Sequence, residues 1–322
     1  MQPQLPEGYS ARAGTLDDLD AVIELVDALE RSFGLEPDAN REEMTWLWRL
    51  PSMDLDRDTR VVTAGDAVVG YANVARVHPQ ETSPWHVRGR VHPSHHGRGV
   101  GAWLAAWNEQ AVASLARTGI RSDVIAEDAS AAELLRVRGY VDVRSFFTMC
   151  RPLAEEDDAG TLPPGIRIRP FRDVEDDRLL FELEERAFAE HWGFEPTTFE
   201  SWNDALKGED WDPSLVWIAE ADGAPAGFNV SFLFEQCGYV GILGVVREFR
   251  GRGIATALLH ASFHEFARRG NREARLGVDA LNTTGAVALY ERVGMRVCRR
   301  YDLYDLGTEE AANVSGGAET TA

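Results

Sequence analysis

Apolar and polar positions in the second half of the chain alternate with periods that predict a series of strands and helices. Ile166 to Arg169 has the alternation of a short strand, and Asp176 to Glu190 carries apolar residues at helical spacing. A longer, half-buried strand is predicted by the alternating residues Phe228, Val230, Phe232 and Phe234. The expected order is strand, two helices, three strands, a glycine-rich loop, then helix, strand, helix and strand.

The first half of the chain repeats this order, and several local patterns recur in both halves. Gly139-Tyr140 and Gly294-Met295 each follow a predicted helix and precede a predicted strand. The runs that begin at Arg12 and Arg169 both have the pattern of a short strand leading into a capped helix. A repeat of about 150 residues corresponds to a whole domain, so we expect two tandem lobes.

The segment between the two repeats and the end of the chain have different compositions from the lobes. Residues 151–164 are acidic and then proline-rich, which is typical of a linker. Residues 307–322 lack periodic apolar positions, which indicates a disordered tail. The sequence therefore predicts a first lobe over residues 1–150 and a second lobe over residues 165–306.

A glycine-rich loop separates a buried strand from a helix in the second lobe. Arg250 to Ala255 follows an apolar run that ends at Val246, and the helix begins at once with Ile254. Such a loop directs several backbone N–H groups to one place at the positive end of the helix dipole, which is a site for a phosphate-bearing anion. Glycine permits close approach of the backbone, and the loop arginines add charge that pairs with phosphate oxygens.

Two other classes of phosphate loop fit this chain poorly. A P-loop requires a lysine within the loop, and the only lysine of the chain is Lys207. The dinucleotide fingerprint is met once, by Gly97, Gly99 and Ala102, but the second lobe has Thr256 at the last position. A tight turn without a ligand is the alternative for one such loop, whereas two loops at matching places favour a ligand.

The composition excludes several classes of protein. The 322 residues, 44% of them hydrophobic, are enough to bury two cores, and no apolar stretch approaches the ~18 residues of a membrane span. A formal net charge of −20 argues against nucleic acid and favours a cationic or amine substrate. Residues 1–7 lack the pattern of a signal peptide. The scattered Cys150, Cys237 and Cys298 suit a reducing compartment, so we expect a cytoplasmic protein.

Histidines gather in the first lobe, where a metal site is one interpretation. The densest group is His92, His95 and His96, with His78 and His86 earlier in the same lobe. Because no cysteine or carboxylate lies near them in sequence to complete a ligand set, a solvated loop is the simpler interpretation. We expect no metal.

The order of elements, the Arg-x-x-Gly-x-Ala loop and the run from Asn282 to Gly294 together resemble the GNAT acetyltransferase superfamily. The duplicated form is similar to the tandem GNAT proteins, a group that includes mycothiol synthase. The resemblance implies an α/β (α+β) fold of two lobes, each a mixed, mostly antiparallel sheet flanked by helices and splayed open between its fourth and fifth strands. It also implies acetyl-CoA as co-substrate, with its pyrophosphate on the loop.

The resemblance assigns roles to residues of the second lobe. Tyr290 takes the position of the acid that protonates the leaving thiolate, and backbone N–H groups of the splayed strand would stabilise charge on the thioester oxygen. Asn282 would either hydrogen-bond the cofactor arm or cap the helix expected from Thr284. The residues expected to bind the cofactor are Leu243, Gly244, Val245, Arg250, Gly251, Arg252, Gly253, Ile254, Ala255 and Asn282.

The proton acceptor is less well defined by the resemblance. Mycothiol synthase carries a glutamate base on the fourth strand, and the matching residue here is Tyr239. Glu190, His191 and Glu235 are the alternatives, directly or through water, and we take Glu190 as the catalytic partner of Tyr290. The aromatic residues Trp192, Phe194, Trp202 and Trp211 either wall the acceptor site or pack in the core.

The first lobe has two departures from the family pattern. His96 stands where the family prefers arginine or glutamine, and Leu135 stands at the place of Tyr290. Because leucine cannot donate a proton, we expect this lobe to be non-catalytic and either to bind CoA or to brace its neighbour. The predicted function is acetyl transfer from acetyl-CoA to a primary amine of a small molecule or peptide, by a monomer or homodimer. A silent CoA-binding sensor is the alternative.

Overall fold

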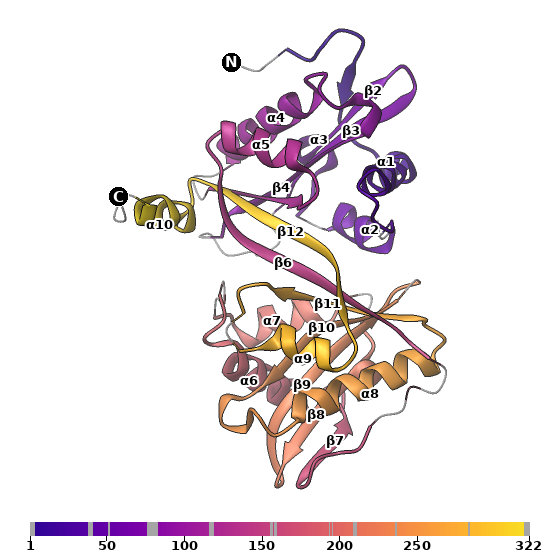
Figure 1. The fold of residues 1–322 in the computed structure, drawn as a ribbon, viewed down its shortest axis with the longest axis vertical. Coiled ribbons are helices and arrows are strands. Elements are labelled where there is room, and N and C mark those ends of the chain that lie inside the picture. The colour runs from indigo at the N-terminus through magenta and orange to yellow at the C-terminus, as the bar shows by residue number, and fades with distance from the viewer. Residues whose placement is uncertain are drawn as a thin grey trace. The chain divides into compact units, whose positions relative to one another are not determined.

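The computed structural model describes residues 4–37, 41–50, 52–75, 83–115, 119–154, 157, 160–192, 194, 196–208, 211–235, 237–282 and 284–318. Within it the chain forms two compact units. Unit 1 comprises Met1–Phe146 and Arg299–Ala322, and unit 2 comprises Phe147–Cys298. Each unit is a mixed, mostly antiparallel sheet with helices on both faces, as the family resemblance implied (Figure 1).

In unit 1 the strands lie in the order β1-β2-β3-β4-β5-β12, and β4 and β5 run parallel while the other described pairs are antiparallel. These strands are β1 (Ser10–Arg12), β2 (Thr59–Ala64), β3 (Ala67–Ala75), β4 (Trp85–Val91), β5 (Ile120–Ile125) and, from Arg299 on, β12 (Arg296–Leu306). The α-helices are α1 (Leu19–Ser32), α2 (Arg41–Arg49), α3 (Leu55–Asp58), α4 (Val100–Leu115), α5 (Ala129–Val137) and α10 (Glu309–Ala318). Figure 1 shows α1 and α2 on one face of the sheet and α4 and α5 on the other.

In unit 2 the order is β11-β10-β9-β8-β7, with the end of β6 (Val141–Pro152) beside β11. These strands are β7 (Ile166–Pro170), β8 (Val216–Ala221), β9 (Ala224–Leu233), β10 (Gly238–Val245) and β11 (Glu273–Asp279). The helices are α6 (Asp177–Phe188), α7 (Phe199–Leu206), α8 (Ile254–Arg268) and α9 (Ala286–Arg292). Separate apolar clusters form under α6 and α7 and under α8 and α9, so the sheet has a core on each face.

An ion pair at the start of each unit shows that the sequence repeat is also a structural repeat. Arg12 Nη2 lies 2.6 Å from Asp18 Oδ1, and its hydrogen bonds lower the pKa of Asp18 to about 2. Arg169 Nη1 likewise lies 2.6 Å from Asp176 Oδ2. Hydrogen bonds from Arg172 and Arg169 hold the pKa of Asp176 well below its usual range. Both pairs join the first strand of a unit to the start of its first helix.

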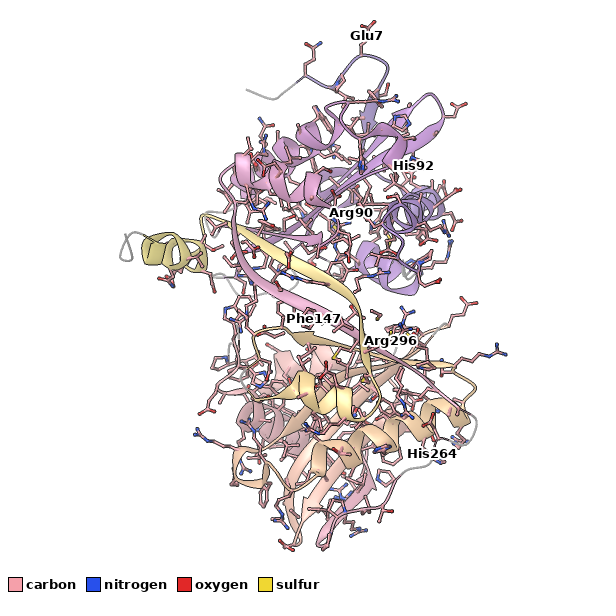
Figure 2. The ribbon with its side chains drawn as sticks, in the orientation of Figure 1. Glu7, Arg90, His92, Phe147, His264 and Arg296 are labelled. Carbon is pink, nitrogen blue, oxygen red and sulfur yellow. The ribbon has the colours of Figure 1, made fainter. Side chains whose placement is uncertain are left out.

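The last strand of the chain is divided between the units in a way that differs from the expected boundaries. From Arg299 on, β12 belongs to unit 1, where it pairs antiparallel with β5. A buried ion pair fixes this edge, because Arg121 Nη2 lies 2.7 Å from Asp305 Oδ2. Conversely β6 belongs to unit 2 from Phe147 on, the residue labelled in Figure 2. Unit 2 is therefore one continuous stretch of sequence, whereas unit 1 is built from two separate stretches.

Part of the segment expected to be a disordered tail forms helix α10. Thr308 caps it, because its Oγ1 accepts a hydrogen bond of 3.1 Å from the backbone N–H of Ala311. The same hydroxyl donates to Asp305 Oδ2 at 2.8 Å, and Ala311 is buried. The helix is therefore specified by the cap at Thr308 and by the buried Ala311, and not by a stripe of apolar residues. No helix among the described residues is long and apolar enough to cross a membrane.

Candidate functional site

In unit 2 the neighbouring strands β10 and β11 are paired over only part of their length. Pairing among the described residues runs from Gly238 to Val240, and a bulge interrupts β10 between Val240 and Ile242. Beyond the bulge β10 stays paired with β9 as far as Val245. Alternate N–H groups of a strand point away from its partner, so those of the second half of β10 that face away from β9 are directed toward β11. This is the splay that the resemblance implied.

Gly244 lies where β10 approaches its neighbours most closely. A Cβ at this position would stand 2.5 Å from Cε1 of Phe228 and 3.0 Å from Cβ of Ala187. A larger residue would force the end of α6 away from the strand. The neighbouring side chains of Leu243 and Val245 pack with Leu258 under α8, on the other face of the sheet.

The loop from Arg250 to Ala255 has the geometry predicted for an anion site. Gly251 and Gly253 adopt φ angles of +77° and +79°, a left-handed conformation that favours glycine. Gly253 is the N-cap of α8, which begins at Ile254. The N–H groups of the first helical turn have no partner within the helix and therefore point at any anion bound by the loop.

Both arginines of the loop are engaged by other parts of unit 2. The Nε of Arg250 donates to the carbonyl oxygen of Val245 at 3.1 Å, and its Nη2 donates to the carbonyl oxygen of Ala187 at 3.0 Å. Arg252 Nη2 lies 2.8 Å from Asp222 Oδ2 at the surface. Arg250 thus ties the loop to β10 and α6, and the backbone N–H groups are the part of the loop left to meet an anion.

Tyr290, the expected acid, is buried on α9. It packs in a cluster that includes Val240 of β10 and Leu276 and Val278 of β11. Burial raises the pKa of Tyr290 to about 12, so the hydroxyl is protonated at neutral pH. The cluster involves both strands of the splay, on the face that α8 and α9 cover.

Asn282 forms the turn that precedes α9. Its Oδ1 accepts a hydrogen bond of 2.8 Å from the N–H of Thr284 and another from the hydroxyl of the same residue. This is an Asx turn, and the helix itself begins later, at Ala286, with Gly285 as its N-cap. The side-chain oxygen of Asn282 therefore shapes the turn and does not cap the helix directly.

The three residues expected as alternative bases lie in different surroundings. Glu190 forms an ion pair with Arg247, and its side chain is 61% exposed. Glu235 is also exposed. His191 is half-buried, and its ring packs on Phe188 with centroids 4.5 Å apart. Burial, reinforced by the charge of Arg250, lowers the pKa of His191.

Two of the aromatic residues expected near an acceptor belong to the core. Trp202 is buried and its Nε1 donates to Glu184 Oε2 at 3.0 Å. Trp211 packs edge-on against Phe171 with ring centroids 5.8 Å apart. Both lie in the cluster beneath α6 and α7, so core packing accounts for them.

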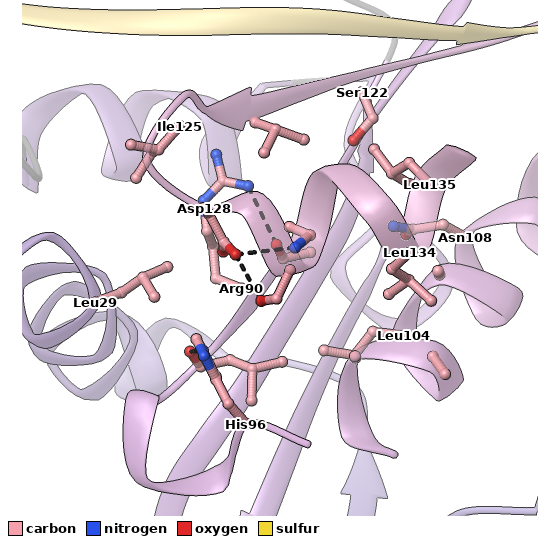
Figure 3. A pocket seen from close by; sticks show the side chains of 18 of the residues that line it. Leu29, Arg90, His96, Leu104, Asn108, Ser122, Ile125, Asp128, Leu134 and Leu135 are labelled. Atoms are coloured by element: carbon pink, nitrogen blue, oxygen red, sulfur yellow. Dashed lines mark hydrogen bonds between the residues drawn. The ribbon is translucent and has the colours of Figure 1, made fainter. Parts of the chain in front are cut away.

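Unit 1 contains a cavity at the corresponding divergence of its own sheet. Pairing of β4 with β5 runs from Trp85 to Val87, and beyond this point both strands line a cavity of about 330 Å³ (Figure 3). Its walls include the loop glycines Gly97 and Gly99 and the helices α4 and α5. The volume is within the range of small-molecule sites.

Two residues of this cavity, His96 and Leu135, relate it to the site of unit 2. The Nε2 of His96 lies 2.9 Å from the carbonyl oxygen of Val91, so His96 makes one of the two contacts that Arg250 makes in unit 2. Leu135, at the place of Tyr290, lines the cavity. Asn108 also lines it, and its buried Oδ1 has no hydrogen-bond partner among the described residues.

An ion pair crosses the diverging strands of unit 1, and the sequence had not indicated it. Arg90 Nη2 on β4 lies 2.6 Å from Asp123 Oδ2 on β5, and Arg88 Nε lies 3.0 Å from Asp123 Oδ1. Register and loop position relate Arg90 and Asp123 to Gly244 and Gly277 of unit 2. The two corresponding positions of unit 2 carry no side chains, and Phe228 and the hydroxyl of Tyr239 lie against them instead.

The histidine group of unit 1 is held by other contacts. His95 Nδ1 lies 2.9 Å from the hydroxyl of Tyr9, and His92 Nδ1 lies 2.8 Å from Ser94 Oγ. The part of the chain that the structure describes contains no group of three or more His, Cys, Asp or Glu side chains suited to a metal. His78 lies outside the described residues.

Sequence comparison identifies a matching family and relatives that are similar over most of this chain. Residues 178–295 match the acetyltransferase (GNAT) family. Mycothiol acetyltransferase from Streptomyces avermitilis is 35% identical over 240 residues, which cover 73% of this chain and 75% of that protein. A protein of the same name from Thermobispora bispora is 30% identical over 87% of this chain and 93% of its own length.

Solved structures agree with these relatives. A GCN5-related N-acetyltransferase from Sphaerobacter thermophilus superposes with a TM-score of 0.83 at 34% identity, over 95% of this chain and 100% of that one. A tandem GNAT protein from the clavulanic acid biosynthesis pathway shares the fold, with a TM-score of 0.68 at 20% identity over 92% of this chain and 97% of that one. The chain therefore belongs to the GNAT acetyltransferase family, as a tandem GNAT N-acetyltransferase that uses acetyl-CoA as co-substrate.

Proposed function

We propose that unit 2 transfers the acetyl group of acetyl-CoA to a primary amine of a small molecule, with Tyr290 as the general acid. The observation that carries this proposal is the combination, in unit 2, of the glycine loop with a buried, protonated tyrosine. Unit 1 has the corresponding loop but Leu135 in place of the tyrosine. Only unit 2 therefore supplies a proton donor at this position.

The proposed site divides the work between backbone and side chains. N–H groups at Leu243, Gly244 and Val245 that face away from β9 bind the pantetheine arm and the thioester oxygen, where charge develops as the amine attacks. The loop from Arg250 to Ala255 holds the pyrophosphate, and Asn282 shapes the turn beside it. The Tyr290 hydroxyl gives its proton to the departing thiolate as the new amide forms.

The acceptor is proposed at the level of a chemical class. Relatives named mycothiol acetyltransferase support a small, amine-bearing acceptor connected with mycothiol. Tyr239 stands where the resemblance led us to expect a glutamate base. Because Tyr239 replaces the expected glutamate beside the acceptor, several classes of amine should be tested, including a peptide N-terminus.

The proposal is tested in two steps with the full chain. Isothermal titration with acetyl-CoA establishes binding, and release of the CoA thiol is then followed with a panel of aminosugars, aminoglycosides, amino acids, cysteinyl amines and peptides. We expect at least one small-molecule class to be acetylated and the Tyr290→Phe variant to lose that activity. Binding of acetyl-CoA with no thiol release from any amine would contradict the proposed function.

We also propose that unit 1 holds CoA or acetyl-CoA without turning it over. The cavity beside its loop supports this, as does Asn108, whose unpartnered Oδ1 suits an amide N–H of the kind present in the pantetheine arm. Titration should then give two sites per chain in the parent protein and one in a Gly99→Val variant. A single site in both proteins would count against this second role.

A further inference from the structure

Strand β11 presents two different faces at the opening of unit 2. Leu276 and Val278 pack in the cluster that contains Tyr290. Successive side chains of a strand point to opposite faces, so Gly277 and Asp279 lie on the other face. There the hydroxyl of Tyr239 stands 3.1 Å from the position that a Cβ on Gly277 would occupy. The opening therefore has the proposed acid on one face and a polar environment on the other.

His191 lies on this second face, just beyond the end of α6. Its ring contacts Phe188, whose ring centroid is 6.4 Å from that of Phe228. The ring of Phe228 in turn lies 2.5 Å from where a Cβ on Gly244 would stand. These contacts connect His191 to the segment of β10 at which the thioester is proposed to bind.

The charged groups around His191 come from the loop, from β11 and from its own segment. Burial and then the charge of Arg250 lower the pKa of His191, whereas Asp279 and Glu190 raise it by smaller amounts. Glu190 is itself paired with Arg247. The net result is a pKa below the ordinary value, so the ring is neutral at pH 7. Within the described residues neither ring nitrogen has a hydrogen-bond partner, which leaves a lone pair to accept a proton.

We infer that His191 accepts the proton that the attacking amine loses, on the face of the sheet opposite Tyr290. The amine nitrogen bonds to the thioester carbon, the carbon–sulfur bond breaks, and the amine proton passes to the imidazole. Tyr290 supplies the proton that the thiolate takes, and water returns the imidazole proton to the phenolate. The base, His191, and the acid, Tyr290, lie on opposite faces of the sheet. The sheet therefore separates them, and each acts from its own side of the opening between β10 and β11. This inference rests on the proposed function of unit 2.

The test compares His191→Gln with Glu190→Gln, the neighbouring alternative, and with His264→Gln. His264 is an exposed control on α8, where its Nδ1 meets a backbone carbonyl. For an accepted amine, His191→Gln should lower kcat/KM by about 10²–10⁴-fold while the Kd of acetyl-CoA is unchanged. In the parent enzyme the acidic limb of the kcat/KM profile should lie below about pH 6.5, and it should vanish in His191→Gln alone.

Three results would overturn the inference. The first is a His191→Gln enzyme that keeps the parent rate and acidic limb, because His191 would then only pack on Phe188. The second is loss of that limb in Glu190→Gln, which would assign the proton to the carboxylate. The third is a loss of acetyl-CoA affinity that matches the loss of rate, since His191 would then shape the cofactor site.

A measurement without any amine separates this inference from the proposed function. The Cε1–H signal of His191 is identified by its absence from the spectrum of His191→Gln. It should titrate below about pH 6.5 and should shift when acetyl-CoA is added. If the chemical shift of this signal does not change when acetyl-CoA is added, the inference is overturned, even if an amine substrate is known. A responsive signal in a protein that acetylates no amine supports this placement and counts against the proposed function alone.

Discussion

Pro163 lies directly against Gly253, because a Cβ on this glycine would stand 3.0 Å from the Cγ of the proline. Unit 1 repeats the arrangement, with Pro6 at 3.1 Å from the corresponding position on Gly99. Each proline belongs to a Leu-Pro-x-Gly segment that leads into the first strand of its unit. In both units the segment before the sheet therefore packs on the glycine loop. It also limits which side chains could replace the second glycine of that loop.

Replacing Gly253 with valine should abolish acetyl-CoA binding by unit 2. A branched side chain is strained at a φ of +79° and would collide with Pro163 beside the loop N–H groups. Isothermal titration measures the effect, and Gly208→Val is a suitable control because no atom lies within 4 Å of the added Cβ there. The equivalent Gly99→Val change should leave most turnover intact. Equal loss of turnover from both loop variants would mean that unit 1 takes part in catalysis.

Tyr290→Phe should lower turnover by about 10²–10⁴-fold with little change in acetyl-CoA affinity, because it removes only the acidic proton. The loss should shrink for a thioester of a more acidic thiol, which leaves without help. Steady-state kinetics and titration provide the two readouts. Tyr71→Phe, at a buried tyrosine of unit 1 that does not line the cavity, is the matched control and should keep the parent turnover and acetyl-CoA affinity.

The pH dependence offers a second check on Tyr290. Burial raises its pKa to about 12, so the acid form persists well above the ordinary value of about 10. Turnover limited by this group should therefore show no alkaline fall between about pH 8 and pH 10. An alkaline limb near pH 10 that disappears in Tyr290→Phe would show that the hydroxyl is exposed to solvent in the working enzyme.

Removing one partner of the buried pair between Arg121 and Asp305 should destabilise unit 1 strongly. Asp305 is fully buried, so Arg121→Met leaves an uncompensated carboxylate and should cost about 3–5 kcal/mol in the free energy of unfolding. Urea unfolding followed by circular dichroism measures the change. Arg121→Met combined with Asp305→Leu should recover most of it, since the charge is then absent. A double variant no better than the single one would contradict this account.

Asp123 should make the free energy of unfolding of unit 1 depend on pH in the acidic range. Burial alone would raise the pKa of this carboxyl, but the charges and hydrogen bonds of Arg88 and Arg90 outweigh burial and hold the pKa well below its usual range. A depressed pKa contributes stability that is present above the unfolded value of about 3.9 and is lost as pH falls below it. Asp123→Asn should therefore lower stability on the order of 3 kcal/mol at pH 7 and by less at pH 3. An unfolding difference that does not change with pH would contradict the assignment.

Local patterns were enough to place the residues of the glycine loop and the tyrosine proposed as general acid. The strand-to-helix turn needs left-handed residues, and glycines stand at 251 and 253 where the structure has positive φ. Helical spacing likewise placed Tyr290 on α9, and its burial agrees with the apolar stripe around it. These features depend on a few neighbouring residues, so short-range sequence carries them. The catalytic roles drawn from them remain predictions.

Long-range contacts could not be derived in the same way. The sequence showed Arg250 as a charge for phosphate, but its guanidinium binds the carbonyls of Val245 and Ala187, residues that only the packing of α6 on β10 brings together. The pair of Arg90 and Asp123 depends on the register between β4 and β5. Arg90 and Asp123 are ordinary charged residues within predicted strands, so the sequence pattern did not distinguish them from charges at the surface.

The sequence by itself determined the duplicated architecture, the order of elements in each repeat, the glycine loops and the asymmetry between Tyr290 and Leu135. Each of these follows from periodicity or from a residue type at a fixed spacing. The tertiary structure decided that β12 completes the sheet of unit 1, that a cavity remains open there, and that His191 lies on the face opposite Tyr290. These three features depend on which distant segments pair and pack. Every strand offers the same backbone N–H and C=O groups, so the local sequence does not by itself show which strand will be its partner.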